Sequence, residues 1–237
     1  MEKLDHAVTR MVFENYGEEK YHDDHIRSVV YLHKFSKYND PEKTGMDVGI
    51  HGHTDKDFST VLYQNHVKGL EIKSKDDEWI SFDPVPSSFI CMAGDGFKVW
   101  SDDGIHTCEH RVTLRENDVR YSLALFSYKE GETCVPNELV DKDHPLKYKP
   151  LHLLEYVQYF MKNYRTLGPN FSIKTLWCLI CRVRDSKSIP LLLFYLINMR
   201  RVFYYSIFSV CLFSICLCGG HHVIASYLMS IACWIQF

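Results

Sequence analysis

The segment HTDKDFSTVLYQNHVKGLEI, residues 53–72, decides how the rest of this 237-residue chain is interpreted. Residues two apart on a β-strand point to the same face, so His53 and Asp55 can reach one point in space. His110, in the segment EHRV at residues 109–112, can supply a third ligand from another strand. Two imidazoles and one carboxylate on one side of a metal suit non-haem Fe(II) with open coordination positions. The sequence therefore predicts a metal centre made of His53, Asp55 and His110.

Other histidines compete for this role, because a His-x-Asp pair occurs often by chance in a chain with 13 His. His51 is the nearest competitor of His53, but only His53 has a carboxylate two positions further on. We expect His66 and His106 to lie on the surface or in loops. A closed structural zinc site would need four protein ligands, and only three are evident, so the pattern favours iron.

A second pair of residues, Arg120 and Ser122, also lies two apart and therefore on one strand face. A guanidinium with a hydroxyl beside it suits a carboxylate. Taken alone, Arg120 could equally be a solvated strand residue. Together with the predicted metal centre, the pair favours an oxygenase that uses an organic acid as its co-substrate.

The middle of the chain has the pattern of antiparallel β-structure, in which short apolar stretches alternate with turn clusters. Such a series of strands predicts a double-sheet jelly roll, whose mouth suits a metal and a ligand. The predicted strands are Thr60–Gln64, Leu70–Lys73, Trp79–Phe82, Phe89–Ala93, Val99–Trp100, Glu109–Thr113 and Tyr121–Tyr128.

Helices are expected on both sides of this β region. Near the N-terminus, apolar residues recur at helical spacing and predict an amphipathic helix with an apolar stripe. The stripe consists of Leu4, Ala7, Val8, Met11 and Val12. His22–His33 is expected to be a short helix, or a helix that leads into a strand, and Leu151–Phe160 a helix outside the barrel.

Three segments together resemble the plant 2-oxoglutarate and Fe(II)-dependent dioxygenases. They are residues 53–72, WISFDPVPSSFICMAGD at residues 79–95, and EHRV followed by RYSLALF at residues 120–126. The subgroup that modifies glucosinolate side chains is the most similar. The resemblance extends from Met1 to about Phe160, and it implies a double-stranded β-helix (jelly roll).

The resemblance also implies a function and a set of cofactors. Fe(II), 2-oxoglutarate and O2 would oxidise a small plant metabolite with release of succinate and CO2. The far carboxylate of 2-oxoglutarate would bind Arg120 and Ser122. Tyr38 matches a tyrosine that hydrogen-bonds the co-substrate near its metal-bound end, although the usual neighbouring Asn is Ser36 here. A buried core tyrosine is the equal alternative for Tyr38.

The resemblance to this family also predicts domain boundaries. We expect residues 1–27 to be a remnant of a longer N-terminal helical region, and residues 28–129 to form the jelly-roll domain. Residues 130–164 are expected to form a C-terminal loop and helix, and residues 165–237 an apolar tail. A shortened front would leave apolar barrel surface exposed, so a catalytically impaired binding protein is an alternative function.

The tail is strongly apolar over residues 189–237 and has three possible explanations. Val202–Cys218 approaches the length of a membrane span, which would make the chain a membrane-anchored interaction protein. The tail could also be core for a further module, or it could come from a translated intron or a faulty gene model, which we favour. Cys178 and Cys181 form a lone CxxC without a second pair at zinc-site spacing, so no zinc site is predicted.

Charge and composition exclude other classes. The net charge of −3 and the mixing of acidic with basic residues argue against a nucleic-acid partner. The first six residues include the charged Glu2, Lys3 and Asp5, where a signal peptide would be apolar, so the 9 Cys are expected to be free thiols in the cytoplasm. A small-molecule substrate is expected, and no protein partner.

Overall fold

The computed structural model describes residues 1–39, 47–114, 118–168 and 171–176. The chain divides into two compact units, one comprising residues 1–172 with 230–237 and the other residues 173–229. Only residues 173–176 of the second unit are described, and they are helical. The description below therefore concerns the first unit.

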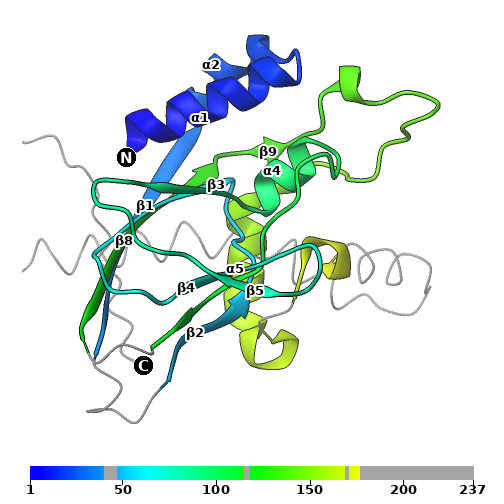
Figure 1. The fold of residues 1–237 in the computed structure, drawn as a ribbon. Coiled ribbons are helices and arrows are strands. Elements are labelled where there is room, and N and C mark those ends of the chain that lie inside the picture. The colour runs from blue at the N-terminus through cyan, green and yellow to red at the C-terminus, as the bar shows by residue number, and fades with distance from the viewer. Residues whose placement is uncertain (40–46, 115–117, 169–170, 177–237) are drawn as a thin grey trace, which may run out of the picture. The chain divides into compact units, whose positions relative to one another are not determined.

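Eight strands form two four-stranded sheets in which every paired strand is antiparallel (Figure 1). The first sheet has the order β1 (Val29–Tyr38), β8 (Arg120–Lys129), β3 (Ser59–Gln64) and β6 (Ile90–Ala93). The second has the order β2 (Val48–His53), β7 (His110–Thr113), β4 (Leu70–Lys73) and β5 (Trp79–Ser81). These two sheets confirm the predicted jelly roll.

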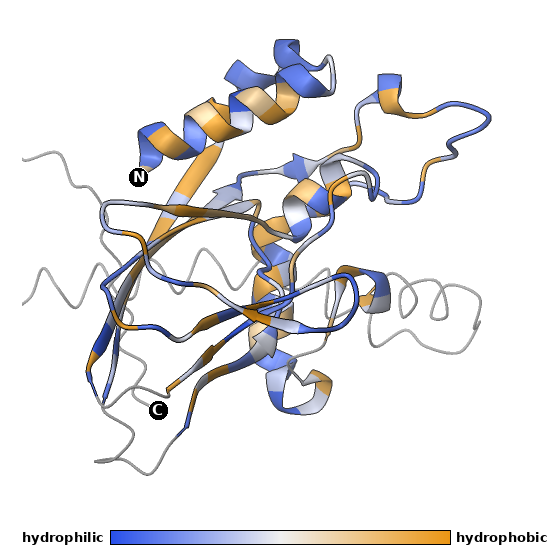
Figure 2. Ribbon diagram, viewed as in Figure 1, coloured by the Kyte–Doolittle hydropathy of each residue, from blue (hydrophilic) through white to orange (hydrophobic). Residues whose placement is uncertain are grey.

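The core lies between the two sheets. Leu62, Met92 and Ala124 from the first sheet form one apolar cluster with Leu70 from the second. Full burial of a leucine contributes about 1.5–3 kcal/mol, so this cluster holds the sheets together. Apolar residues recur along the strands of both sheets and along helix α5 (Leu153–Leu167), as Figure 2 shows.

Helices and short elements surround the sheets. They are α1 (Glu2–Asn15), η1 (Glu19–Tyr21), α2 (His22–Arg27), α4 (Asp95–Trp100), β9 (Glu132–Thr133), η2 (Asn137–Leu139), β10 (Leu151–His152) and α5 (Leu153–Leu167). The expected N-terminal helix is thus present. His22–His33 is a helix that leads into a strand, and Leu151–Phe160 starts with a β9–β10 pair before α5 begins.

Helix α1 buries mainly a face beside the predicted apolar stripe, of which Leu4, Val8 and Val12 are half-buried. Asp5, Thr9 and Phe13, spaced four apart, are the buried residues, whereas Met11 is 60% exposed. Polar partners explain the difference, since the Tyr31 hydroxyl donates to Asp5 Oδ2 at 2.8 Å. Hydrophobic periodicity cannot detect a buried face that is held by hydrogen bonds.

The predicted strand Val99–Trp100 is wrong, because both residues end helix α4. An apolar run this short does not distinguish a strand from a buried helix segment. The Trp100 ring stacks on Phe13 with centroids 4.2 Å apart, which buries both side chains.

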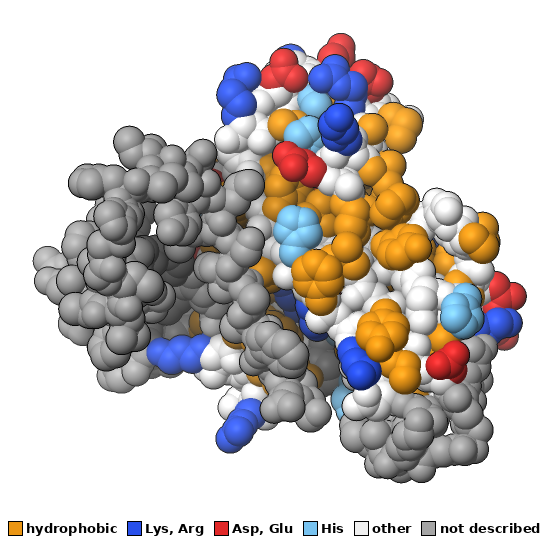
Figure 3. Space-filling view, turned by 90° about the vertical axis from the view of Figure 1, so that its left-hand side faces the viewer, with side chains coloured by type: hydrophobic (Ala, Val, Ile, Leu, Met, Phe, Trp, Pro, Cys, Tyr) orange, Lys and Arg blue, Asp and Glu red, His pale blue; other side chains and the backbone are white. Residues whose placement is uncertain are grey.

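One face of the molecule carries a band of apolar side chains beneath the charged N-terminal helices (Figure 3). Several large apolar residues of the first sheet and its flanking loop are exposed, among them Phe35 at 79%, Tyr121 at 50% and Phe89 at 45%.

None of the helices in the described residues is long and apolar enough to span a membrane. The predicted span Val202–Cys218, the rest of the apolar tail and the CxxC at Cys178 lie outside those residues.

Candidate metal and carboxylate site

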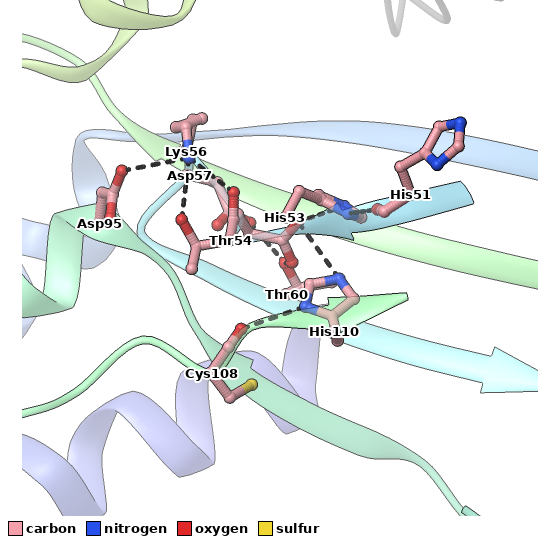
Figure 4. A network of polar contacts seen from close by, with 10 residues as sticks. His51, His53, Thr54, Lys56, Asp57, Thr60, Asp95, Cys108 and His110 are labelled. Carbon is pink, nitrogen blue, oxygen red and sulfur yellow. Dashed lines mark hydrogen bonds and ion pairs between the residues drawn. The ribbon is translucent and has the colours of Figure 1, made fainter. Parts of the chain in front are cut away.

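The structure brings His53, Asp55 and His110 together. His53 ends β2 and pairs with His110 at the start of β7, and Asp55 lies in the loop just beyond β2. One potential ligand atom from each residue lies within 4.8 Å of the others. Asp55 Oδ1 is 3.6 Å from His53 Nε2 and 3.7 Å from His110 Nε2. His53 and His110 lie close together in Figure 4, and with Asp55 they are the one such group found among the described residues.

Backbone contacts orient the two imidazoles. His53 Nδ1 lies 2.8 Å from the carbonyl of His51, and His110 Nδ1 lies 3.2 Å from the carbonyl of Cys108. A carbonyl can only accept, so each Nδ1 carries the proton and each Nε2 is left with its lone pair. Such hydrogen bonds typically fix the tautomer of metal-binding histidines.

The electrostatics of the site favour a neutral His53. Burial lowers the pKa of His53, and the nearby His110 lowers it further, whereas Asp55 raises it. A neutral imidazole is the form that binds metal.

The competing histidines are not part of this group. The His51 ring points away from the other two rings in Figure 4, and its residue is exposed. His66 and His106 are also exposed, as expected.

Thr60 on β3 holds the carboxylate of Asp55 from behind. Its Oγ1 lies 2.6 Å from Asp55 Oδ2 and 2.8 Å from Asp57 Oδ2. Burial, and secondly the charge of Asp55, raise the pKa of Asp57 well above its usual range. The Thr60 hydroxyl donates to Asp55 Oδ2, and the same hydroxyl ties the Asp57 carboxyl to this group. Asp55 Oδ1 is thereby left to face the two imidazoles.

A buried cation fixes the same loop to two helices. Lys56 Nζ donates to the carbonyl and hydroxyl of Thr54 at 2.8 and 2.9 Å (Figure 4). It also lies 3.7 Å from Asp95 Oδ2 on α4, and the Tyr156 hydroxyl of α5 donates to that same oxygen at 2.7 Å. Burial lowers the pKa of Lys56 and raises that of Asp95, and each partner opposes the effect on the other. Sequence reasoning missed this network, because it joins residues from three elements.

Arg120, at the start of β8, is 1% exposed and has spare donors. Its Nη2 donates to Gln64 Oε1 at 2.5 Å, and its guanidinium carbon lies 5.0 Å from the centre of the Tyr38 ring. Within the described part of the chain, its Nε and Nη1 have no hydrogen-bond partner. Burial lowers the pKa of Arg120, and Tyr38 raises it. An arginine keeps its proton in proteins, so a buried cation with free N–H groups remains.

Strand register places the other predicted residues beside Arg120. Tyr38 pairs with Arg120 across β1 and β8, and Ser122 pairs with Gln64 across β8 and β3. Arg120 and Ser122 share a face with Ala124, which packs in the core between the sheets. The predicted carboxylate clamp therefore faces the inside of the jelly roll. Gln64 was missed, although its even spacing from Thr60 on β3 was a usable signal.

Comparisons with known proteins find similarity to 2-oxoglutarate-dependent oxygenases. The sequence profile of the 2OG-Fe(II) oxygenase superfamily matches residues 20–129. "Probable 2-oxoglutarate-dependent dioxygenase AOP1" of Arabidopsis thaliana is 38% identical over 164 residues, covering 67% of this chain and 54% of that protein. This chain thus spans about half the length of the curated relatives it matches.

Solved structures share the fold. The structure of JOX2 in complex with 2OG, Fe and JA superposes with a TM-score of 0.64 at 26% identity, covering 73% of this chain and 52% of that one. The structure of AtDAO1, a dioxygenase for auxin oxidation from Arabidopsis thaliana, with 2-oxoglutarate gives a TM-score of 0.56 at 28% identity, covering 60% and 55%.

Proposed function

We propose that this chain is a 2-oxoglutarate- and Fe(II)-dependent dioxygenase, because residues 20–129 match the sequence profile of the 2OG-Fe(II) oxygenase superfamily. It would oxidise a small plant metabolite and release succinate and CO2. The observation that carries the proposal is the convergence of two Nε2 atoms and one carboxylate oxygen within 4.8 Å. This donor set suits Fe(II) and leaves coordination positions open.

His53, Asp55 and His110 are the proposed iron ligands. Bound Fe(II) would supply the redox chemistry that couples O2 and the keto acid to oxidation of the substrate. The protein contributes two neutral imidazoles, whose lone pairs are directed by backbone carbonyls, and a carboxylate held by Thr60.

Arg120 and Ser122 are the proposed partners of the far carboxylate of 2-oxoglutarate. A buried guanidinium with unpaired N–H groups is costly unless an anion satisfies it. The orphaned Nε and Nη1 of Arg120 therefore support a carboxylate ligand at this place. Tyr38 was expected near the metal-bound end of the co-substrate. Its ring lies beside the Arg120 guanidinium instead, so it is proposed to contact the same co-substrate near the far carboxylate.

The test is turnover by the full chain with Fe(II), 2-oxoglutarate and ascorbate under air. We expect succinate to form only when both Fe(II) and 2-oxoglutarate are present. His110→Ala should abolish succinate formation, whereas His106→Ala, which changes an exposed histidine, should leave it unchanged. Binding of Fe(II) and 2-oxoglutarate without succinate would instead favour the impaired binding protein. Turnover that survives His110→Ala would reject the assignment of the ligands.

A further inference from the structure

We infer that Gln64 is a specificity-determining residue of the carboxylate subsite. Its Oε1 fixes the guanidinium of Arg120, and its Nε2 donates a hydrogen bond of its own to the far carboxylate of the keto acid. This inference rests on the proposed function and adds to it a contact from β3, the strand that lies beside β8.

The first step is the geometry of the Gln64–Arg120 pair. Gln64 is 9% exposed, and its Oε1 accepts from Arg120 Nη2 at 2.5 Å. Because a guanidinium can only donate, this contact fixes which end of the amide faces Arg120. The NH2 group of Gln64 must therefore point elsewhere.

The second step concerns the atoms left without partners. Within the described residues, Gln64 Nε2, Arg120 Nε and Arg120 Nη1 are buried and make no hydrogen bond. All three atoms are donors. Native proteins rarely bury such groups unpaired, so each unpaired donor calls for an explanation. A cluster of orphaned donors from two neighbouring side chains indicates a bound acceptor.

The third step identifies the chemistry of that acceptor. A carboxylate is an acceptor only, and it offers about four lone-pair positions on two oxygens. It can take hydrogen bonds from the guanidinium and from the amide at the same time. A neutral hydroxyl or amide ligand would leave the guanidinium charge without a counter-ion. The Ser122 hydroxyl, directly across from Gln64 in the strand register, completes the set of donors.

A purely structural role for Gln64 makes a different prediction. If Gln64 only held Arg120 in place, Gln64→Glu would serve as well or better, because Arg–carboxylate pairs are strong. In our inference the Glu carboxylate would occupy Arg120, remove the Nε2 donor and repel the co-substrate. The two roles therefore predict opposite effects of one substitution that keeps the side-chain volume.

The experiment uses the full chain with Mn(II) in place of Fe(II), so that binding is measured by calorimetry without turnover. The probes are 2-oxoglutarate and 2-oxobutanoate, which keeps the keto acid but lacks the far carboxylate. Gln64→Leu should weaken 2-oxoglutarate binding about tenfold or more, since one hydrogen bond to a charged group is lost. Its binding of 2-oxobutanoate should not change. Gln64→Glu should weaken 2-oxoglutarate binding more than Gln64→Leu does.

Tyr63→Phe is the matched control, because Tyr63 lies next to Gln64 on β3 but on the opposite face and is 41% exposed. It should bind both acids like the unmodified chain. The inference is overturned if Gln64→Glu binds 2-oxoglutarate normally, or if Gln64→Leu loses affinity for both acids equally. If the unmodified chain binds 2-oxobutanoate as tightly as 2-oxoglutarate, or neither, the proposed function fails as well.

Discussion

Replacing Asp5 of helix α1 with Ala should destabilise the chain far more than replacing Met11 of the same helix with Ser. Ranking these residues by hydrophobicity gives the opposite order. In the structure Asp5 is 2% exposed and Met11 is 60% exposed. The contrast therefore tests whether polar contacts hold α1 on the first sheet.

The magnitude follows from the partners of Asp5. Its Oδ2 accepts from the Tyr31 hydroxyl at 2.8 Å, and its Oδ1 accepts from the Ser59 hydroxyl. Hydrogen bonds to charged groups contribute about 1.5–3 kcal/mol each. Ser59 keeps a second partner, because its Oγ also lies 2.7 Å from Ser127 Oγ. We therefore take the lower end of this range for each of the two hydrogen bonds. The free energy of unfolding should fall by about 3 kcal/mol for Asp5→Ala, and by less than about 0.5 kcal/mol for the surface change Met11→Ser.

Urea unfolding of the full chain, followed by tryptophan fluorescence, measures both free energies of unfolding. A double-mutant cycle of Asp5→Ala with Tyr31→Phe should give a coupling energy on the order of 1 kcal/mol. Equal losses for Asp5→Ala and Met11→Ser would refute the reasoning, because they would make the apolar stripe the packed face. A coupling energy near zero would refute the role of Tyr31.

Three further predictions concern the loop after β2 and one buried histidine. Lys56→Met leaves the Asp95 carboxylate buried without its cation and should cost about 3–5 kcal/mol in urea unfolding, and the double change with Asp95→Asn should cost less. Gly94→Ala would place a Cβ 2.1 Å from Asp57 Oδ1, so the loop must shift and calorimetry should show weaker Mn(II) binding. His25 has a pKa lowered from 6.5 to about 3, chiefly by burial, so the unfolded chain takes up a proton first and stability is lost as the pH falls below 6.5. The test is the free energy of unfolding at pH 7 and at pH 5. Its fall between these two pH values should be about 2 kcal/mol smaller for His25→Leu than for the unmodified chain.

Local patterns were sufficient for much of the β-structure. Leu70–Lys73 was predicted with the bounds that β4 has, and Thr60–Gln64 misses only the first residue of β3. Both segments lie next to strong turn signals, and most of their side chains are buried. The ten-residue strand β1 was foreseen only as the continuation of a short helix, because half-exposed residues with lysines interspersed carry little alternation.

The convergence of His53, Asp55 and His110 was predictable because it follows from their spacing and from one strand pair. His53 and Asp55 are two residues apart, and His110 is the direct partner of His53 in the sheet. The contacts that hold the centre were not predictable in the same way. Thr60 binds Asp55 across a turn, and Lys56 contacts Asp95 on α4, which is distant in the sequence. Such contacts depend on tertiary packing rather than on a local period.

The two faces of β3 connect the parts of the proposed site. On the inner face, Thr60 donates to Asp55, the proposed metal ligand, and Gln64 accepts from Arg120. On the outer face, the Ser59 hydroxyl donates to Asp5 of α1. Side chains on a strand alternate, so a register slip of one residue would exchange these faces and disable all three contacts together. The register of β3 against β8 is therefore the structural condition on which the metal loop, the carboxylate subsite and the N-terminal helix all depend. A substitution that loosens α1 from Ser59 acts on the same strand that positions Thr60, which links the stability of the N-terminal helix to the proposed chemistry.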